Sequence, residues 1–256
     1  MIAGTIMHEF LAGIHEADDE RRAEWQMSAQ AMYMEQVSAN TNKDGKVDLH
    51  KDIEMIPAVI AGYKQTPAVT LTGRTELWGA VINDQMHLRA KIDLITNDRK
   101  KIYDYKFTGN SDFYTHFTTR IQAGIYLLVW PEAETITYRI IQKPALRQGK
   151  NETKEEFLRR ITEDIAKRHK HYIQDRTFYR SEYDFTYIKQ YISNISAEIR
   201  ENIDLGETLF FQEDSGCWCY NSWCEYLPIC QSKANPFSLT DLYTKREVTD
   251  VGFEED

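Results

Sequence analysis

The sequence predicts an α/β or α+β fold in which helices pack against a mixed central sheet. Apolar residues recur at helical spacing near the N-terminus, in residues 4–37. Three runs with strand character follow in residues 74–108, separated by short polar turns. A helical segment at 118–130 then precedes a further strand at 135–143. The order helix, three strands, helix, strand indicates a sheet sandwiched between helices.

The first helix is predicted from apolar residues three and four apart, such as Met7 and Leu11, while the charged run "EADDERRAE" is expected to face solvent. The next segment, residues 40–51, has the Asn, Asp-Gly and Val-Asp spacing of a calcium-binding loop. Lys51 stands at the twelfth position, where such a loop needs a bidentate glutamate. We therefore favour a glycine-containing turn over a calcium site.

The three strands form a predicted β-meander with turns at "NDQ" and "TNDRK". Beyond the fourth strand, two amphipathic patterns predict helices over residues 152–173 and 184–203. We expect a core over residues 1–145, a helical and locally basic extension over 146–205, and a cysteine-rich segment with an acidic tail over 206–256.

Composition limits the classes of function. The 256 residues are 42% hydrophobic and can bury a sizeable core. We expect a cytoplasmic protein without membrane association, because the sequence has neither a run of about 18 apolar residues nor the start of a signal peptide. The net charge of −9 does not favour general polyanion binding, since nonspecific nucleic-acid affinity comes mainly from Lys and Arg.

Local charge differs from the total. Residues 143–180 hold eleven Lys or Arg against six Asp or Glu, whereas residues 232–256 hold three against six. The basic stretch could contact phosphates, and the alternative is a solvated amphipathic helix.

The run "IYDYK" places an acid and a base two positions apart on a predicted strand. Asp104 and Lys106 therefore share one face of that strand. An exposed ion pair is the simple alternative, worth about 0–1 kcal/mol. Asp93, in "AKIDLI", ends the preceding strand, and the short turn should bring its carboxylate within a few ångströms of the pair.

Two converging carboxylates repel each other unless a cation lies between them, and hard divalent ions prefer such oxygen ligands. The sequence therefore predicts a Mg²⁺ or Mn²⁺ site at Asp93 and Asp104. Lys106 would orient or help deprotonate a water, or neutralise charge on a phosphoryl oxygen. Gln122 and Tyr126, four apart on the next helix, share one face and carry groups suited to phosphates or bases.

Four motifs occur together in this chain: "GTIMH", "KIDLI", "IYDYK" and "QAGIY". Their order and spacing over residues 4–142 resemble the PD-(D/E)XK nuclease superfamily, and within it the RecB-type branch that includes CRISPR-associated and phage exonucleases. The resemblance implies a restriction-endonuclease-like fold. It also implies that His8, Asp93, Asp104 and the Tyr105 carbonyl bind metal, and that Lys106 is the catalytic lysine.

The resemblance further implies that Gln122 and Tyr126 support DNA binding, although alone they would be ordinary helix residues, as His8 alone would be a structural histidine. With the basic stretch, the expected DNA-contacting residues are Gln122, Tyr126, Lys143, Arg147, Lys167, Arg168 and Lys170.

The four cysteines of the chain, Cys217, Cys219, Cys224 and Cys230, all lie within fourteen residues. Such clustering in a cytoplasmic protein favours metal ligation over disulfides. Many RecB-type relatives bind a [4Fe–4S] cluster through three C-terminal cysteines and one that precedes the Gly-x-x-x-His helix. No cysteine precedes that helix here, so either Cys217 replaces it, or an N-terminal piece is missing, or no cluster forms. A zinc site and free thiols remain alternatives.

These observations favour a metal-dependent DNA nuclease, expected to be an exonuclease of phage, CRISPR or recombination type in a bacterial or phage-infected cell. The alternative is a non-cleaving DNA-binding or scaffold subunit within a recombination or CRISPR-adaptation complex. Intact Asp93, Asp104 and Lys106 argue against that alternative. A cysteine-dependent redox or metal sensor is a third class, but no reactive-thiol context supports it.

Overall fold

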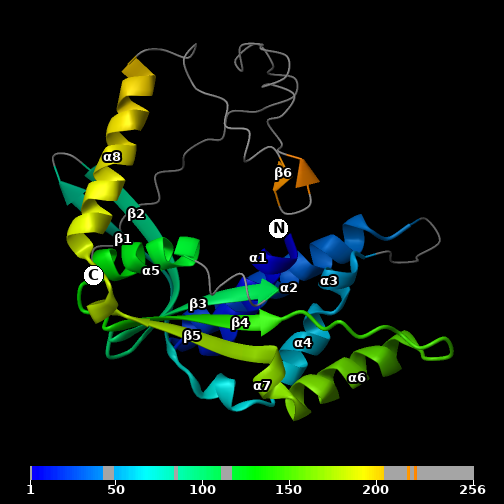
Figure 1. Ribbon diagram of the computed structural model, residues 1–256. Coiled ribbons are helices and arrows are strands. Elements are labelled where there is room, and N and C mark those ends of the chain that lie inside the picture. The colour runs from blue at the N-terminus through cyan, green and yellow to red at the C-terminus, as the bar shows by residue number, and fades with distance from the viewer. Residues whose placement is uncertain are drawn as a thin grey trace. The chain divides into compact units, whose positions relative to one another are not determined.

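The structure is a computed structural model that describes residues 2–42, 49–83, 86–110, 117–204, 218–219 and 222–223 (Figure 1). Its helices are α1 (Ile2–His15), α2 (Asp19–Ala39), α3 (Lys51–Glu54), α4 (Ile56–Tyr63), η1 (Pro67–Thr70), α5 (Phe117–Val129), α6 (Lys154–Lys167), α7 (His169–Tyr172), η3 (Arg180–Glu182) and α8 (Phe185–Asp204). Its strands are β1 (Gly73–Asn83), β2 (Met86–Thr96), β3 (Lys101–Thr108), β4 (Thr135–Gln142), β5 (Ile173–Tyr179), β6 (Trp218–Cys219) and β7 (Ser222–Trp223).

The central sheet has five strands in the order β1-β2-β3-β4-β5. Antiparallel pairing joins β1 to β2 and β2 to β3, which confirms the predicted meander. β3 and β4 are parallel, and β5 is antiparallel to β4. Parallel neighbours need a crossover connection, and α5 lies in the one between β3 and β4. The sheet is therefore mixed, as the sequence predicts.

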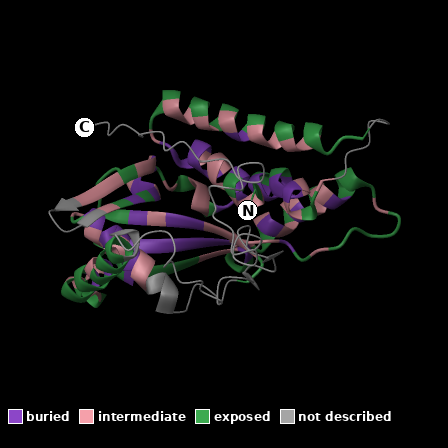
Figure 2. Cartoon of the chain, turned by 90° about the horizontal axis from the view of Figure 1, so that it is seen from above, coloured by how far each residue is buried: buried purple, intermediate pink, exposed green. Residues whose placement is uncertain are grey.

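Helices cover both faces of the sheet. On one face, α1, α4 and α6 form a hydrophobic core with strand residues such as Leu94 and Ile141. On the other face, α5 packs against Ile102, Ile136 and Ile140 among others. Figure 2 shows the buried residues concentrated in the central strands and in the helix surfaces that meet them. The fold is an α/β sandwich, consistent with the restriction-endonuclease-like architecture.

The predicted continuous helix over residues 4–37 is wrong, because the helix is interrupted at residues 16–18, between α1 and α2. Asp18 is the N-cap of α2, with an extended backbone (φ −80°, ψ 129°) and a side chain that accepts a hydrogen bond from the Arg21 amide. The Glu16 side chain, before the cap, is fully buried. Of the acids in "EADD", Glu16 enters the interior, Asp18 caps a helix and Asp19 is exposed, so they do not form one solvent face.

The predicted helix over residues 152–173 is also too long. α6 ends at Lys167, where Arg168 leaves the helical conformation (φ −110°, ψ 35°), and α7 and β5 follow. β5 was not predicted. At its start, α6 carries a capping box in which Thr153 and Glu156 bond each other's backbone amides.

Two compact units divide the chain, Met1–Tyr191 and Ile192–Asp256. In the first unit, α6 packs on α4 and β5 completes the sheet, so residues 154–179 join the core directly. In the second, β6 and β7 form a two-stranded ladder. The domain boundaries at 145/146 and 205/206 stay predictions. The glycine turn at 40–51 lies mostly outside the described residues.

None of the helices within the described ranges has the length and apolar character needed to cross a membrane.

Candidate active site

The site forms where β2 and β3 stop pairing. Their ladder contains Ile95 opposite Ile102 and Leu94 opposite Tyr103, so the next opposing positions are Asp93 and Asp104. There the Tyr105 amide donates a hydrogen bond at 2.6 Å to the side-chain Oδ2 of Asp93 in β2, and not to a backbone carbonyl of that strand. The divergence of the two strands thus leaves room for two carboxylates and orients one of them.

His8 reaches this point from α1. The neighbouring residues Ile6 and Met7 are fully buried in the core, which places His8 at the flank of the buried helix surface. Its Nδ1 lies 3.4 Å from Asp93 Oδ1. Burial alone would lower the pKa of His8, but the hydrogen bond and charge of Asp93, with Asp104 further off, raise it.

The Asp93 carboxyl responds in the opposite direction. Burial tends to raise its pKa, yet the pKa is lowered overall by His8, by the Tyr105 amide and by the charge of Lys106. Asp93 is therefore the carboxylate of the site that the protein itself keeps ionised.

Asp104 and Lys106 face each other on β3, as their spacing predicts, with Lys106 Nζ 2.5 Å from Asp104 Oδ2. Asp104 is only 2% exposed. Burial, followed by the negative charge of Asp93, raises the pKa of Asp104 to about 6, against the opposing effect of Lys106. Lys106 Nζ also lies 5.5 Å from the centroid of the Tyr138 ring.

The Gln122–Tyr126 pair of α5 contacts Asp104 from the other face of the sheet. The Tyr126 hydroxyl donates to Asp104 Oδ1 at 3.4 Å, and Gln122 Nε2 donates to the same hydroxyl at 3.0 Å. Tyr138 in turn donates to Gln122 Oε1 at 3.4 Å. These two α5 residues are thereby placed to orient Asp104, and their contact with DNA stays a prediction.

The Tyr105 side chain is buried in the core that α1 forms with one face of the sheet. Its ring stacks on the ring of His15, with centroids 5.5 Å apart and an interplanar angle of 13°. The contact between its amide and Asp93 is a finding, whereas metal binding by its carbonyl stays a prediction.

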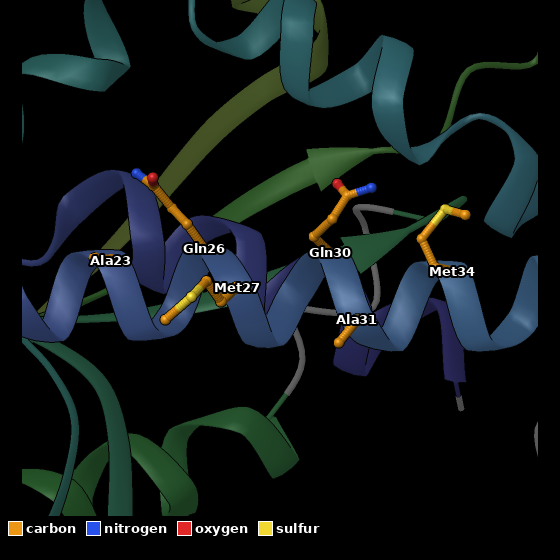
Figure 3. Close-up of a pocket in the computed structure, with 6 residues that line it drawn as sticks. All are labelled: Ala23, Gln26, Met27, Gln30, Ala31 and Met34. Atoms are coloured by element: carbon orange, nitrogen blue, oxygen red, sulfur yellow. The ribbon is translucent and has the colours of Figure 1, made fainter.

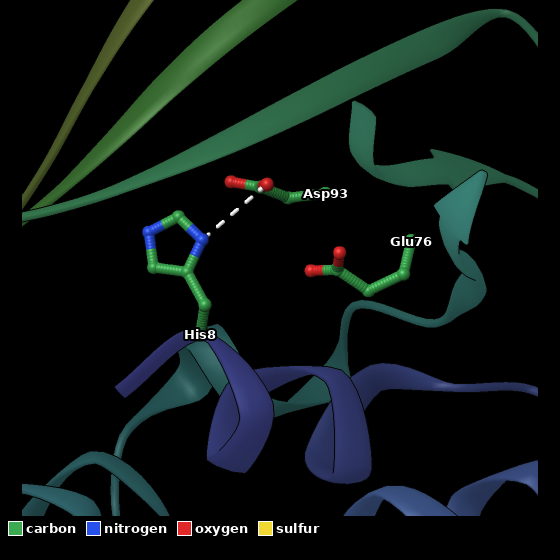
Figure 4. A group of neighbouring side chains, drawn as sticks. All are labelled: His8, Glu76 and Asp93. Carbon is green, nitrogen blue, oxygen red and sulfur yellow. Dashed lines mark ion pairs between the residues drawn. The ribbon is translucent and has the colours of Figure 1, made fainter. Parts of the chain in front are cut away.

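Glu76 is a site residue that the sequence motifs missed. One ligand atom each from His8, Glu76 and Asp93 can be chosen so that all three lie within 4.8 Å of one another (Figure 4). The β1–β2 ladder closes with Asn83 opposite Met86. Counting back from a two-residue turn places Glu76 opposite Asp93, so the turn position was the signal that could have found it.

The donor set fits a hard divalent cation. His8, Glu76 and Asp93 can each bring one ligand atom within 4.8 Å of the other two, and the buried Asp104 carboxylate interacts electrostatically with Asp93 and His8. Oxygen-rich sets of this kind suit Mg²⁺ and Mn²⁺. The raised pKa of Asp104 reflects first the cost of burying its charge and then the cost of holding that charge beside Asp93, and a bound cation would reduce both costs.

The predicted basic contacts are dispersed. Lys143 Nζ pairs with Asp52 at 2.5 Å, and Arg168 pairs with Asp164 one helical turn earlier. The side chains of Arg147, Lys167 and Lys170 are exposed. Ion pairs within the chain thus offset part of the local surplus of positive charge.

The backbone of Cys219 lies in β6, and Cys217, Cys224 and Cys230 lie outside the described residues. Their ligation of iron or zinc stays a prediction.

A shallow groove along α2 contains none of the predicted site residues. Figure 3 shows the six residues that line it, which are Ala23, Gln26, Met27, Gln30, Ala31 and Met34. None of these side chains titrates, so this groove lacks the groups for acid, base or cation chemistry.

A mixed sheet whose diverging central strands present two aspartates and a lysine, joined by a histidine from the first helix, defines a nuclease of the restriction-endonuclease-like fold. The comparison with known families agrees, since the sequence model of the PD-(D/E)XK nuclease superfamily matches residues 2–231. The chain belongs to the PD-(D/E)XK nuclease superfamily.

Two solved structures are similar to this chain. One is a protein proposed to be an exonuclease from Eubacterium rectale, with a TM-score of 0.47, 12% identity and coverage of 86% of this chain and 75% of that chain. The other is a phage-related exonuclease from Haemophilus somnus 129PT, with a TM-score of 0.32, 14% identity and coverage of 75% and 95%. No curated protein matches the sequence significantly.

Proposed function

We propose that this protein is a divalent-metal-dependent deoxyribonuclease that hydrolyses phosphodiester bonds, acting as an exonuclease. The observation that carries the proposal is the convergence of Asp93, Asp104, Lys106 and His8 where β2 and β3 diverge. A structural ion pair between Asp104 and Lys106 would need neither a second carboxylate nor a histidine beside it.

Asp93, Asp104 and His8 would hold Mg²⁺ or Mn²⁺, with the Tyr105 carbonyl as a further ligand. Such an ion, when bound, stabilises charge on the phosphate and makes a nearby water more acidic. The Tyr105 amide and His8 keep Asp93 ionised and oriented. Gln122 and Tyr126 fix the Asp104 carboxyl from the α5 side.

Lys106 supplies the mobile positive charge of the site. Its ammonium group lies against Asp104 and can move toward a phosphoryl oxygen as negative charge develops there. The same group can orient the attacking water or help to deprotonate it. Both roles require a position beside the metal ligands, which its location on β3 supplies.

For DNA, we propose that phosphates contact the exposed Arg147, Lys167 and Lys170, while Lys143 and Arg168 contribute less because acidic partners already offset their charge. Action within a phage, recombination or CRISPR-adaptation system is part of the proposal and rests on the RecB-type motifs alone. A [4Fe–4S] cluster on the four cysteines is the accompanying proposal for the C-terminal segment.

One assay tests the proposal. End-labelled single-stranded and double-stranded DNA, and a closed circular DNA, are incubated with the protein and Mn²⁺, Mg²⁺ or EDTA. We expect metal-dependent loss of the linear substrates and survival of the circle. Cleavage of the circle would indicate an endonuclease. DNA binding without cleavage under every metal condition would favour the non-cleaving subunit.

A further inference from the structure

Glu76 lies in the metal site but belongs to none of the four sequence motifs. Its carboxylate is within reach of the ligand atoms of His8 and Asp93, and its side chain is only 9% exposed (Figure 4). We propose that Glu76 is a further ligand of the metal bound by Asp93 and His8, and that Lys91 competes with the metal for the Glu76 carboxylate. This inference rests on the proposed function.

The sheet register places three acids in one row. Thr75 is opposite Leu94 and Leu77 is opposite Ile92, so Glu76 falls opposite Asp93, as Asp93 falls opposite Asp104 on the next strand. Like charges on directly opposing strand positions destabilise a sheet. A row of carboxylates across β1, β2 and β3 is therefore expected where a cation neutralises their charge. Asp93 is on the middle strand of the row, between Glu76 and Asp104.

The backbone at Glu76 departs from the strand conformation. Its φ of 54° is in the left-handed region, which is unfavourable for a glutamate, and the pair with Asp93 is missing from an otherwise continuous ladder. This local distortion redirects the Glu76 side chain relative to a regular strand residue.

Thr75, the residue before Glu76, is held by hydrogen bonds from two sides. The fully buried Glu16 carboxylate accepts hydrogen bonds from the Thr75 amide at 3.0 Å and from its hydroxyl at 2.7 Å. Arg21 donates to the Thr75 carbonyl at 3.0 Å. The turn between α1 and α2 thus fixes Thr75, and with it the position from which Glu76 extends. Glu16 and Arg21 are positioning residues in this scheme.

Substitution of Lys91 should change metal affinity in the direction opposite to substitution of Glu76. Its ammonium group pairs with the Glu76 carboxylate, and its side chain is 39% exposed. A cation that binds Glu76 must displace or repel this ammonium group. Removing the Lys91 charge should therefore favour metal binding, whereas removing the Glu76 charge should weaken it.

The test is Mn²⁺ titration of the EDTA-treated full-length protein, followed by the electron paramagnetic resonance signal of free Mn²⁺. The variants are Glu76→Gln, Lys91→Gln and, as a matched control, Glu134→Gln, whose carboxylate is 67% exposed and pairs with Lys100. We expect Glu76→Gln to weaken Mn²⁺ binding by about 10-fold to 100-fold, since loss of even an outer-sphere partner costs that much. We expect Lys91→Gln to tighten binding severalfold and Glu134→Gln to leave it unchanged.

A folded Glu76→Gln protein that binds Mn²⁺ within twofold of the wild type would overturn the proposal. If that variant does not fold, an unchanged or weaker affinity in Lys91→Gln overturns it instead, because a purely structural pair predicts no tightening. The variant Asp93→Asn distinguishes failure of the Glu76 proposal from failure of the nuclease proposal. Loss of Mn²⁺ binding in Asp93→Asn with no change in the Glu76 and Lys91 variants leaves the nuclease proposal standing and removes only Glu76.

Discussion

At the scale of single residues, Asp104 and Lys106 share a contact but not a chemical role. The aspartate is buried between Lys106, Tyr126 and the negative charge of Asp93, whereas the lysine keeps 19% of its side chain exposed. Only the lysine is exposed enough to turn toward a phosphate, and the buried Asp104 carboxylate that it leaves would then need a bound cation as its partner.

The two residues should therefore fail differently when substituted. Asp104→Asn removes a ligand charge, so Mn²⁺ affinity and cleavage should both fall. Lys106→Ala removes a positive charge beside the cation, so Mn²⁺ binding should be retained or tightened while cleavage falls about 10²–10⁴-fold, the usual worth of an oriented acid–base group. Single-turnover cleavage and Mn²⁺ titration on both variants measure this. Cleavage near the wild-type rate by Lys106→Ala would remove its catalytic role.

His15 is the buried residue whose protonation the fold opposes most clearly. Its Nδ1 donates to the Leu71 carbonyl at 2.7 Å, which leaves Nε2 to accept from the Tyr63 hydroxyl at 2.9 Å. Arg139 in turn donates to that hydroxyl at 3.5 Å. Burial, with a smaller effect of the Arg139 charge, lowers the pKa of His15 to about 4.

The sign of the resulting pH dependence follows from the lowered pKa. Above pH 6.5 the histidine is neutral in both states, so its native contacts contribute fully. As the pH falls from 6.5 toward 4, the unfolded chain takes up the proton and the folded one does not. We expect a loss of about 2 kcal/mol of stability by pH 5 from this residue. Urea unfolding at pH 7.5 and pH 5 should show this loss reduced in His15→Gln.

The exposed His171 provides the control for that measurement, since His171→Gln should keep the pH slope of the wild type. If His15→Gln also kept that slope, the buried imidazole would not be the source of the acid sensitivity.

At the scale of elements, the end of α6 and the turn into α7 decide how basic the surface can be. Arg168 is engaged by Asp164 and by the Tyr172 hydroxyl, while Lys167 and Lys170 extend from the same turn with exposed side chains. Formal charge counted along the sequence therefore overstates the charge available to phosphates.

DNA binding should reflect this difference. Lys167→Gln with Lys170→Gln should weaken binding and flatten its dependence on salt by about two units of logarithmic slope, one for each lost phosphate contact. Arg168→Gln is the comparison from the same turn and should have a smaller effect. A salt series by fluorescence anisotropy measures both. If the double variant and the wild type showed equal salt-dependence slopes, this region would be an ordinary solvated surface that does not contact DNA.

Elements also mark the limits of inference from sequence. The strands of Asp93 and Asp104 were predictable because alternating apolar residues and short turns specify them locally. The break at residues 16–18 was missed because a polar run continued a helical pattern, although Asp18 is a favourable N-cap residue. β5 was missed because "IQDRTFY" lacks clear alternation and is a strand only through its pairing with β4.

At the scale of the whole molecule, the sequence predicted those residues of the candidate site that belong to a motif. It did not predict those that only the pairing of the strands brings into the site. His8 is far from Asp93 in the sequence, and its motif alone connected the two. Glu76 has no motif, and its place beside Asp93 follows from where the β1–β2 turn falls. Ion pairs such as Lys143 with Asp52 depend on segments that only the fold brings together.

The cysteine segment allows one prediction for the intact chain. Protein purified without oxygen should be brown and contain iron, and Cys224→Ala or Cys230→Ala should lose both the colour and part of the stability, because ligand binding contributes directly to folding. Absorption spectra and elemental analysis measure this. Colourless protein with neither iron nor zinc would exclude the cluster and the zinc alternative together.

The spread of the site along the chain has a kinetic consequence. Asp93, Asp104 and Lys106 come from adjacent strands and can meet early in folding, whereas His8 and Tyr126 come from α1 and α5, which longer stretches of sequence separate from these residues. Closing long loops is slow because their entropy must be lost before distant contacts form. We expect that in a newly made chain Asp93 and Asp104 come together first. His8 and Tyr126, which orient them, would join only when α1 and α5 pack on the sheet. Nuclease activity would then arise late, after the rest of the molecule is assembled.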